Sequence, residues 1–291
     1  MAEAQQKRLA LATGVELDVW TTGDPANPPI IFLHGFPESH RTWRHQMAAL
    51  SDRYFCIAPD QRGYARSQKL PEVKDYRINN LVADVFALAD AFGAERFTLV
   101  GHDWGGAIGM GCAARHPERI KQFVLFNTSA FFVPVLPLRI AVCRVPVLGE
   151  LLVRGLNGFA RGALTFATSQ PERFTPDVKA GYLAPYADWR SRIALHRFVR
   201  DIPMEDTHPT RATLNDLDKE LPRFQHHRML ILWGEDDFCF TKQDFLPEWK
   251  RRFPDAEVHL LENAGHYVVE DAIERIIPLM TTFLERERRA A

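Results

Sequence analysis

The stretch that most constrains this chain is residues 97–106, where an apolar segment runs into a glycine-rich turn. The apolar residues end at Gly101, and two polar residues, an aromatic residue and a pair of glycines follow. A helix-like segment then covers residues 107–115. Side chains in place of Gly101 and Gly105 would clash in so tight a turn, which glycine tolerates because it has no Cβ. The pattern predicts strand, sharp turn and helix, with Asp103 at the apex.

The layout matches the G-x-S-x-G signature of α/β-hydrolases, in which a nucleophile sits on a strained strand-to-helix turn. Here the nucleophile position holds Asp103 instead of serine. A serine that attacked a saturated carbon would form an ether, which water does not easily cleave, whereas a carboxylate forms an ester. Asp103 therefore predicts displacement at a saturated carbon, followed by hydrolysis of an alkyl-enzyme ester. The alternative is that Asp103 only caps the following helix, and its downstream partners decide between the two.

Composition bounds the fold and the partners. The chain has 291 residues, 46% hydrophobic and 25% charged, with a formal net charge of -1. This length suits one large core, or one core with an insertion. No basic surplus points to nucleic acid or to an anionic membrane. We expect a small hydrophobic substrate and water as the partners, and a monomer or homodimer.

The cysteines and the apolar segments indicate the cellular compartment. The four cysteines are far apart and form no Cys-x-x-Cys pair, so neither a disulfide framework nor a metal site is predicted. We expect no cofactor. The first ten residues lack the apolar centre of a signal peptide, and the longest uncharged run, residues 123–138, is too short to span a membrane. The sequence therefore predicts a cytoplasmic protein.

Strand-like and helix-like segments alternate in two parts of the chain, which predicts an α/β fold with a mostly parallel, doubly wound sheet. Besides the central strand, the predicted strands are 9–13, 15–22, 30–33, 54–58, 120–126, 229–233 and 257–261, and the predicted helices are 42–50, 78–92, 107–115, 242–252 and 271–287. Between them, helical pieces punctuated by prolines replace the alternation; they are 138–142, 149–159, 176–183 and 190–199. We predict a core domain of residues 1–128 and 215–291, and a helical lid of residues 129–214.

Two polar residues after late strands are the predicted partners of Asp103. In a hydrolytic triad of this fold an acid and then a histidine follow the nucleophile along the chain. Asp237 follows strand 229–233 and His266 follows strand 257–261, at strand ends where sites of parallel sheets gather. His266 is the predicted base, which activates the water that hydrolyses the ester, and Asp237 is the predicted orienting acid. Asp236 is the weaker candidate because the usual Gly-x-x-Asp spacing selects Asp237; taken alone, His266 could be an ordinary hydrogen-bonded loop histidine.

An ester intermediate also needs donors for its oxyanion. The predicted donors are the backbone N–H groups of Trp104, directly after the nucleophile, and of Phe36, after the early strand. The side chain of Trp104 would face the leaving group and could donate its indole N–H.

The first 130 residues or so carry motifs that resemble those of the epoxide hydrolases of the α/β-hydrolase superfamily. They are His34-Gly35-Phe36-Pro37-Glu38-Ser39, Asp60-Gln61-Arg62-Gly63-Tyr64 and Gly101-His102-Asp103-Trp104-Gly105-Gly106. The second half is more similar to haloalkane dehalogenases, and within them to the branch that includes olefin-forming β-lactone decarboxylases. The segments that carry this similarity are 154–157, 182–186, 197–203 and 265–271. Both resemblances imply an α/β-hydrolase fold and an aspartate nucleophile.

The resemblances differ in the leaving group that they imply. Most dehalogenases near this branch hold the halide with an asparagine at the position of Phe36. Epoxide hydrolases use two lid tyrosines as acids, one of them in a Trp-Tyr-Arg context, but here Trp189 precedes Arg190 directly. Tyr182 and Tyr186 are the remaining lid candidates for a proton donor.

Because Phe36 favours a strained oxygen ring over a halide, we predict an epoxide hydrolase that opens epoxides to diols. The alternatives are a haloalkane dehalogenase and a β-lactone-processing enzyme. An alternative from a different class is a non-catalytic ligand-binding protein of the same fold.

Overall fold

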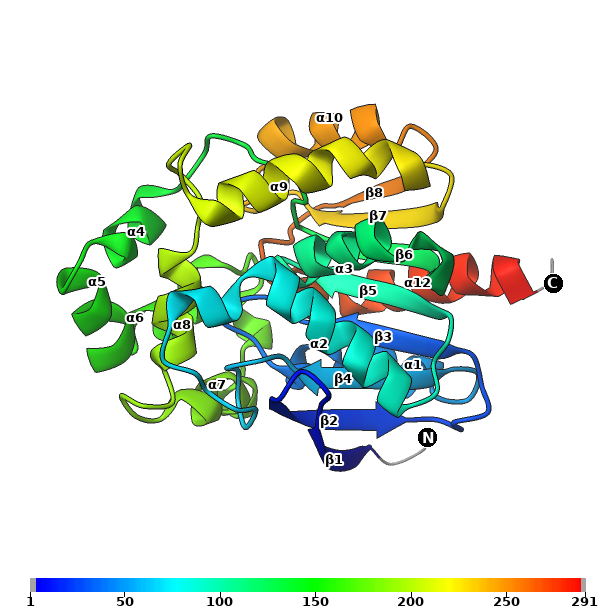
Figure 1. The fold of residues 1–291 in the computed structure, drawn as a ribbon, viewed down its shortest axis with the longest axis horizontal. Helices are drawn as coiled ribbons and strands as arrows, with labels where there is room; N and C mark the ends of the chain where they lie inside the picture. Colours follow the sequence, from blue (N-terminus) through cyan, green and yellow to red (C-terminus); the bar gives the residue numbers. More distant parts are fainter. Residues whose placement is uncertain (1–3, 289–291) are drawn as a thin grey trace.

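The computed structural model describes residues 4–288 and is centred on an eight-stranded sheet (Figure 1). The strand order is β1-β2-β4-β3-β5-β6-β7-β8. β2 is antiparallel to both of its neighbours, and every other pair of adjacent strands is parallel. The strands are β1 (Gln5–Ala10), β2 (Glu16–Thr22), β3 (Pro29–Leu33), β4 (Phe55–Asp60), β5 (Phe97–His102), β6 (Ile120–Phe126), β7 (Arg228–Gly234) and β8 (Glu257–Leu261).

Helices cover both faces of this sheet (Figure 1). One face carries α1 (Arg44–Leu50), α11 (Val268–Asp271) and α12 (Ile273–Arg288), and the other carries α2 (Ile78–Ala91), α3 (Trp104–Arg115) and α10 (Lys242–Arg252). Successive strand residues alternate between two apolar cores, because side chains of a strand point to opposite faces. In β3, for example, Ile31 belongs to one core and Phe32 to the other. The predicted mostly parallel, doubly wound sheet is therefore confirmed.

Between β6 and β7 the chain forms a series of short helices. They are α4 (Leu138–Ala141), α5 (Leu148–Glu150), α6 (Gly158–Phe166), α7 (Pro176–Leu183), α8 (Ile193–Arg200) and α9 (Pro209–Glu220), with a π-helical segment at Leu151–Gly155. The helix predicted over residues 149–159 is wrong, because Asn157 takes a φ of 52° and separates the π-helical segment from α6. The sequence analysis also missed α9, whose buried apolar side chains are only Leu214 and Leu217.

The division into a core and a lid stays a prediction. Its expected second boundary, between residues 214 and 215, falls inside α9. Helices α4 to α8 lie beyond the carboxyl ends of the parallel strands, on the left in Figure 1. No helix in the described part of the chain combines the length and the apolarity needed to cross a bilayer.

Candidate active site

The turn after β5 places Asp103 in a strained conformation. Asp103 has a φ of 50° and a ψ of -122°, a left-handed φ that costs a residue other than glycine about 1–3 kcal/mol. A Cβ on Gly101 would lie 2.7 Å from the carbonyl oxygen of Gly105, and a Cβ on Gly105 would overlap the carbonyl oxygen of Leu33. Asp103 occupies the N-cap position of α3, but its side chain makes no capping hydrogen bond. The geometry therefore does not support the helix-cap alternative.

The two carboxylate oxygens of Asp103 face different groups. Oδ1 accepts a hydrogen bond of 2.8 Å from the backbone N–H of Phe36, and Oδ2 lies 3.8 Å from Nε2 of His266. Burial raises the pKa of Asp103, while the charges of His266 and His102 and the backbone N–H of Trp104 oppose that rise. One oxygen thus contacts a predicted oxyanion donor, and the other is directed toward the predicted base.

His266 and Asp237 form a buried ion pair. Nδ1 of His266 lies 2.8 Å from Oδ2 of Asp237. Burial alone would lower the pKa of His266, but the charge and hydrogen bond of Asp237, followed by the charge of Asp103, raise it to about 9. Burial would likewise raise the pKa of Asp237, yet His266 and the N–H groups of Cys239 and Phe240 hold it below its ordinary value. The carboxylate of Asp237 therefore favours the protonated form of His266.

The structure separates the two adjacent carboxylates after β7. Asp237 contacts His266, as the Gly-x-x-Asp spacing predicts. Oδ2 of Asp236 instead accepts a hydrogen bond of 3.1 Å from the hydroxyl of Ser169.

Asn127 is a buried part of the site that the sequence analysis did not identify. It directly follows β6, and its Nδ2 donates a hydrogen bond of 2.7 Å to Oδ2 of Asp237. Its Oδ1 accepts one of 2.7 Å from the backbone N–H of Gly234. Asn127 thereby ties the loop that carries Asp237 to the neighbouring strand. Its position in the sequence could have identified it, because a polar residue immediately after a buried parallel strand lies where sites of such sheets gather.

A second buried network lies behind the nucleophile. Glu38 accepts a hydrogen bond of 2.7 Å from the backbone N–H of Gly35, and its Oε1 lies 3.0 Å from Nδ1 of His102. Nε2 of His102 lies 2.9 Å from the carbonyl oxygen of His266. Burial would raise the pKa of Glu38, but His102 lowers it. The network connects the loop after β3, the turn after β5 and the loop that carries His266.

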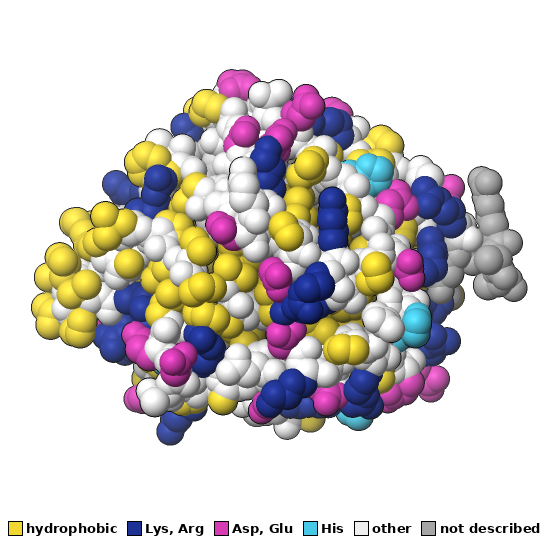
Figure 2. Space-filling view, turned by 90° about the horizontal axis from the view of Figure 1, so that it is seen from above, with side chains coloured by type: hydrophobic (Ala, Val, Ile, Leu, Met, Phe, Trp, Pro, Cys, Tyr) yellow, Lys and Arg dark blue, Asp and Glu magenta, His cyan; other side chains and the backbone are white. Residues whose placement is uncertain are grey.

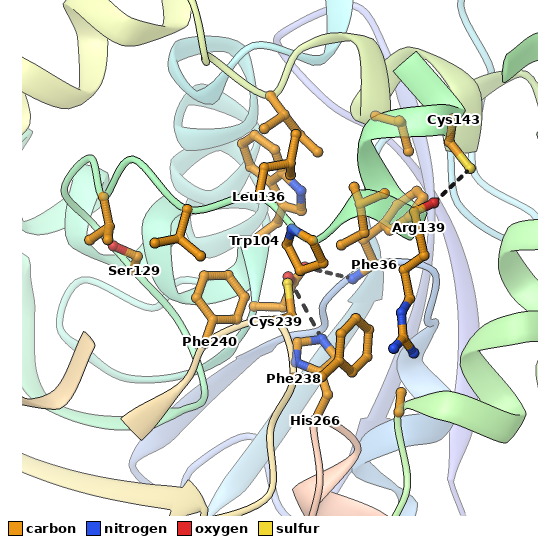
Figure 3. Close-up of a pocket in the computed structure, with 18 of the residues that line it drawn as sticks. Phe36, Trp104, Ser129, Leu136, Arg139, Cys143, Phe238, Cys239, Phe240 and His266 are labelled. Atoms are coloured by element: carbon orange, nitrogen blue, oxygen red, sulfur yellow. Dashed lines mark hydrogen bonds and ion pairs between the residues drawn. The ribbon is translucent and has the colours of Figure 1, made fainter. Parts of the chain in front are cut away.

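Asp103 and His266 both line a cavity of about 280 Å³, and Figure 3 shows His266 among the residues around it. Phenylalanines dominate its wall: Phe36, Phe131, Phe132, Phe159, Phe166, Phe238, Phe240 and Phe245. The side chain of Trp104 also lines the cavity. No three His, Cys, Asp or Glu side chains of residues 4–288 gather in a way that could hold a metal ion.

The structure does not bring the two lid tyrosines to this cavity. The hydroxyl of Tyr182 donates a hydrogen bond of 2.8 Å to Oε1 of Glu270, and that of Tyr186 donates one of 2.6 Å to the carbonyl oxygen of Glu38. Both side chains are buried. Among the described residues, no tyrosine lines the cavity.

Comparisons with known proteins agree with this architecture. Residues 28–273 match a family model described as the alpha/beta hydrolase fold. A cis-3-alkyl-4-alkyloxetan-2-one decarboxylase from Shewanella oneidensis is 39% identical over 261 residues, which cover 88% of this chain and 81% of the relative. Epoxide hydrolase A from Mycobacterium tuberculosis is 42% identical over 135 residues, which cover 46% of this chain and 40% of the relative.

A solved structure supports the same fold. The crystal structure of a haloalkane dehalogenase from Bradyrhizobium elkani superposes with a TM-score of 0.88 at 24% identity and covers 99% of this chain and 100% of that chain. The family model matches residues 28–273, which is most of the chain. The oxetanone decarboxylase from Shewanella oneidensis is 39% identical over 88% of the chain. The chain therefore belongs to the α/β-hydrolase fold family and is an enzyme of the α/β-hydrolase type.

Proposed function

We propose that Asp103 is a covalent nucleophile and that the substrate is a 2-oxetanone, a β-lactone ring, with apolar substituents. The observation that carries the proposal is the arrangement of the Asp103 carboxylate. Oδ1 is held by the N–H of Phe36, Oδ2 lies 3.8 Å from Nε2 of His266, and Asp103 lines the cavity. The phenylalanine-lined wall suits apolar substituents on the ring. His266, which is paired with Asp237, is the titratable group beside the reacting atoms, and its protonation state sets the positive charge there.

The leaving group distinguishes a β-lactone from an epoxide. Oδ2 of Asp103 attacks the saturated ring carbon bonded to the ring oxygen; the C–O bond breaks and its electron pair goes to the ring oxygen. From a β-lactone this oxygen leaves as a carboxylate, which needs no proton because carboxyl groups have pKa values of about 4. From an epoxide it leaves as an alkoxide, which needs a donor near neutral pH. The absence of a tyrosine from the described cavity wall therefore favours the lactone.

The charge balance then favours loss of carbon dioxide over hydrolysis. Opening the lactone moves the negative charge from Asp103 to a carboxylate that stays tethered in the same cavity. His266 thus keeps a nearby counter-charge, remains protonated and does not activate water. The bond between the carboxylate carbon and the neighbouring carbon of the former ring then breaks, and carbon dioxide leaves. That electron pair forms a C=C bond, and the bond to Oδ2 breaks with its pair returning to Asp103. An alkene forms and no water is consumed.

The comparisons support the same choice of substrate. The oxetanone decarboxylase is 39% identical over 88% of this chain, whereas the 42% identity to epoxide hydrolase A spans only 46% of it. A solved epoxide hydrolase structure that covers 96% of this chain is 30% identical, so over most of the chain the identity is higher to the decarboxylase. The sequence-based preference for epoxides came from Phe36. An epoxide would also need a proton donor, and neither lid tyrosine lines the cavity.

Epoxide hydrolysis is the second candidate, because the matched 135 residues are 42% identical to an epoxide hydrolase. In that reaction the alkoxide takes the proton that His266 carries, relayed through water, so no anion remains beside His266 once Asp103 is esterified. The pKa of His266 then falls, and its neutral imidazole can take a proton from water. Water attacks the ester carbon, and the oxyanion forms on Oδ1, which contacts the N–H of Phe36.

A product assay with three matched substrates tests the proposal. A cis-3,4-dialkyl-oxetan-2-one, an epoxide and a bromoalkane with the same alkyl chains are each mixed with the enzyme, and alkene, diol, hydroxy acid, carbon dioxide and bromide are measured. We expect alkene and carbon dioxide in equal amounts from the lactone. Asp103→Ala should abolish this turnover, and the matched control Asp236→Asn should retain it. Diol or bromide formed faster than alkene would refute the lactone assignment, and hydroxy acid in place of alkene would refute the decarboxylation step.

A further inference from the structure

The exposed apolar side chains of this protein gather at one end of the molecule. Within the described residues ten large hydrophobic side chains are exposed, and eight of them lie between residues 135 and 166. We call this surface the apolar tip; it consists of Val135, Leu138, Val145, Val147, Leu148, Leu151, Leu156 and Phe166. Figure 2 shows hydrophobic side chains covering the protruding end where α4, α5 and α6 lie in Figure 1. Exposed apolar surface of this extent marks an interaction site.

The turn before α5 exposes the apolar side chain of Val147 to water and holds its backbone in a strained conformation. Val147 is 74% exposed and has a φ of 62° and a ψ of -59°. The N–H of Leu148 donates a hydrogen bond of 2.7 Å to the carbonyl oxygen of Pro146, which closes a γ-turn around Val147. This γ-turn conformation is rare and strained, and a β-branched residue is a clear outlier in it. An exposed valine in such a strained turn suits a surface whose apolar side chains insert into an apolar environment.

The tip also surrounds the mouth of the cavity. Val135 and Phe166 are both exposed to solvent and part of the cavity wall. Arg139 lines the cavity as well, with its guanidinium 5.0 Å from the ring centroid of Phe166 and 4.4 Å from that of Phe238. A substrate that leaves the cavity therefore meets the tip directly.

Charge at the tip differs from charge in the whole chain. Residues 129–168 contain four arginines and a single acidic residue, Glu150, although the chain has a net charge of -1. Glu150 forms an ion pair with Arg154. Among the side chains of residues 4–286, Arg139 and Arg161 form no ion pair with a carboxylate. Apolar side chains that insert, bordered by arginines, are typical of proteins that bind the surface of an anionic bilayer.

We propose that the apolar tip binds the surface of membranes that contain anionic lipids, with the mouth of the cavity facing the acyl chains. Val147 and its neighbours enter the apolar layer, and Arg139 and Arg161 contact lipid phosphates. A hydrophobic substrate dissolved in the bilayer then reaches the cavity without crossing water. The proposal does not depend on the chemistry assigned to Asp103.

A second copy of the chain fits this surface less well than a bilayer. In a two-fold contact the same patch meets itself, so the unpaired arginines of both copies would face each other. Such a contact would also cover the mouth of the cavity at Val135 and Phe166.

Vesicle flotation tests the proposal with the full-length enzyme. One set of vesicles is pure phosphatidylcholine, and another contains about 30% phosphatidylglycerol, which supplies anionic headgroups. A triple variant, Leu138→Gln with Val147→Asn and Leu151→Gln, removes apolar surface without touching the cavity wall. Asparagine is among the residues that adopt a positive φ most readily. The matched control is Leu260→Gln, which replaces the exposed leucine of β8, 47% exposed and outside the tip. Thermal unfolding of each variant verifies that it is folded.

We expect the wild-type enzyme to float with the anionic vesicles and the triple variant to bind at least about tenfold more weakly. Leu260→Gln should bind like the wild type. Arg161→Gln should weaken binding to the anionic vesicles only, and high salt should have the same effect. Equal flotation of the triple variant and the wild type would overturn the proposal, as would absence of wild-type binding. Dimers that dissociate in the triple variant, without vesicle binding, would instead assign the surface to a second copy.

Discussion

The buried pair of His266 and Asp237 predicts how stability depends on pH. The pKa of His266 is about 9 in the folded enzyme, and an unfolded histidine has a pKa of about 6.5. Because the folded pKa is the higher one, the contribution is fully present below pH ~6.5 and is lost as pH rises through ~9. A difference of roughly 2.5 pKa units at about 1.4 kcal/mol each corresponds to roughly 3–4 kcal/mol over the full titration.

The perturbation that isolates this contribution is His266→Gln. Wild-type enzyme and variant are unfolded with denaturant at several pH values, and their free energies of unfolding are subtracted. The subtraction removes groups common to both proteins, including Cys56, whose pKa burial raises to about 12. We expect the advantage of the wild type to shrink by about 3 kcal/mol between pH ~6 and ~9.5. A difference that stays constant across this range would refute the ion pair as the structure describes it.

Further predictions concern the surroundings of the site. Asn127→Ala removes a hydrogen bond to the carboxylate of Asp237, worth about 1.5–3 kcal/mol; steady-state kinetics should show a kcat lower by about 10–100-fold. The surface control Asn80→Ala should leave kcat unchanged, and an unaffected Asn127→Ala would contradict the positioning role. Tyr182→Phe should lower the free energy of unfolding by about 1 kcal/mol. It should keep kcat within about threefold, because the hydroxyl of Tyr182 donates its hydrogen bond to Glu270 outside the cavity. A loss of activity without a loss of stability would restore this tyrosine as the acid. Gly105→Ala should abolish soluble folded enzyme, because its Cβ overlaps backbone; a circular dichroism spectrum and melting curve like those of the wild type would contradict the close packing of the turn.

The sheet and the main side chains of the site could be predicted from the sequence because both depend on simple regularities. A run such as Ile30 to Leu33, buried on both faces of the sheet, is uninterrupted in the sequence. Carboxyl ends of parallel strands meet at one edge, so polar residues after two late strands could be assigned to one site. The distances between His266 and Asp237 and between His266 and Asp103 agree with that assignment, and their roles remain proposals.

Other features depend on tertiary packing, which a local pattern indicates only weakly or not at all. Asn127 carries no charge, and its function as a donor is visible only once its strand lies beside β7. The direction of Tyr182 is set by burial against Tyr267 and by its bond to Glu270, which a residue's place in a helix does not reveal. The apolar tip could not be distinguished from core-packing residues, because short helices with many apolar residues do not indicate which face is covered.

The central claim is that Asp103 forms a covalent bond to the substrate, and mass spectrometry of the quenched enzyme tests it most directly. Enzyme is mixed with excess lactone, quenched in acid at short times and digested, and the peptide that contains Asp103 is fragmented. If Asp103 is the nucleophile, its carboxylate gains the mass of one whole lactone, and Asp103→Ala neither gains mass nor turns over. Undiminished turnover by Asp103→Ala, with no mass gained at that position in the wild type, would contradict this claim.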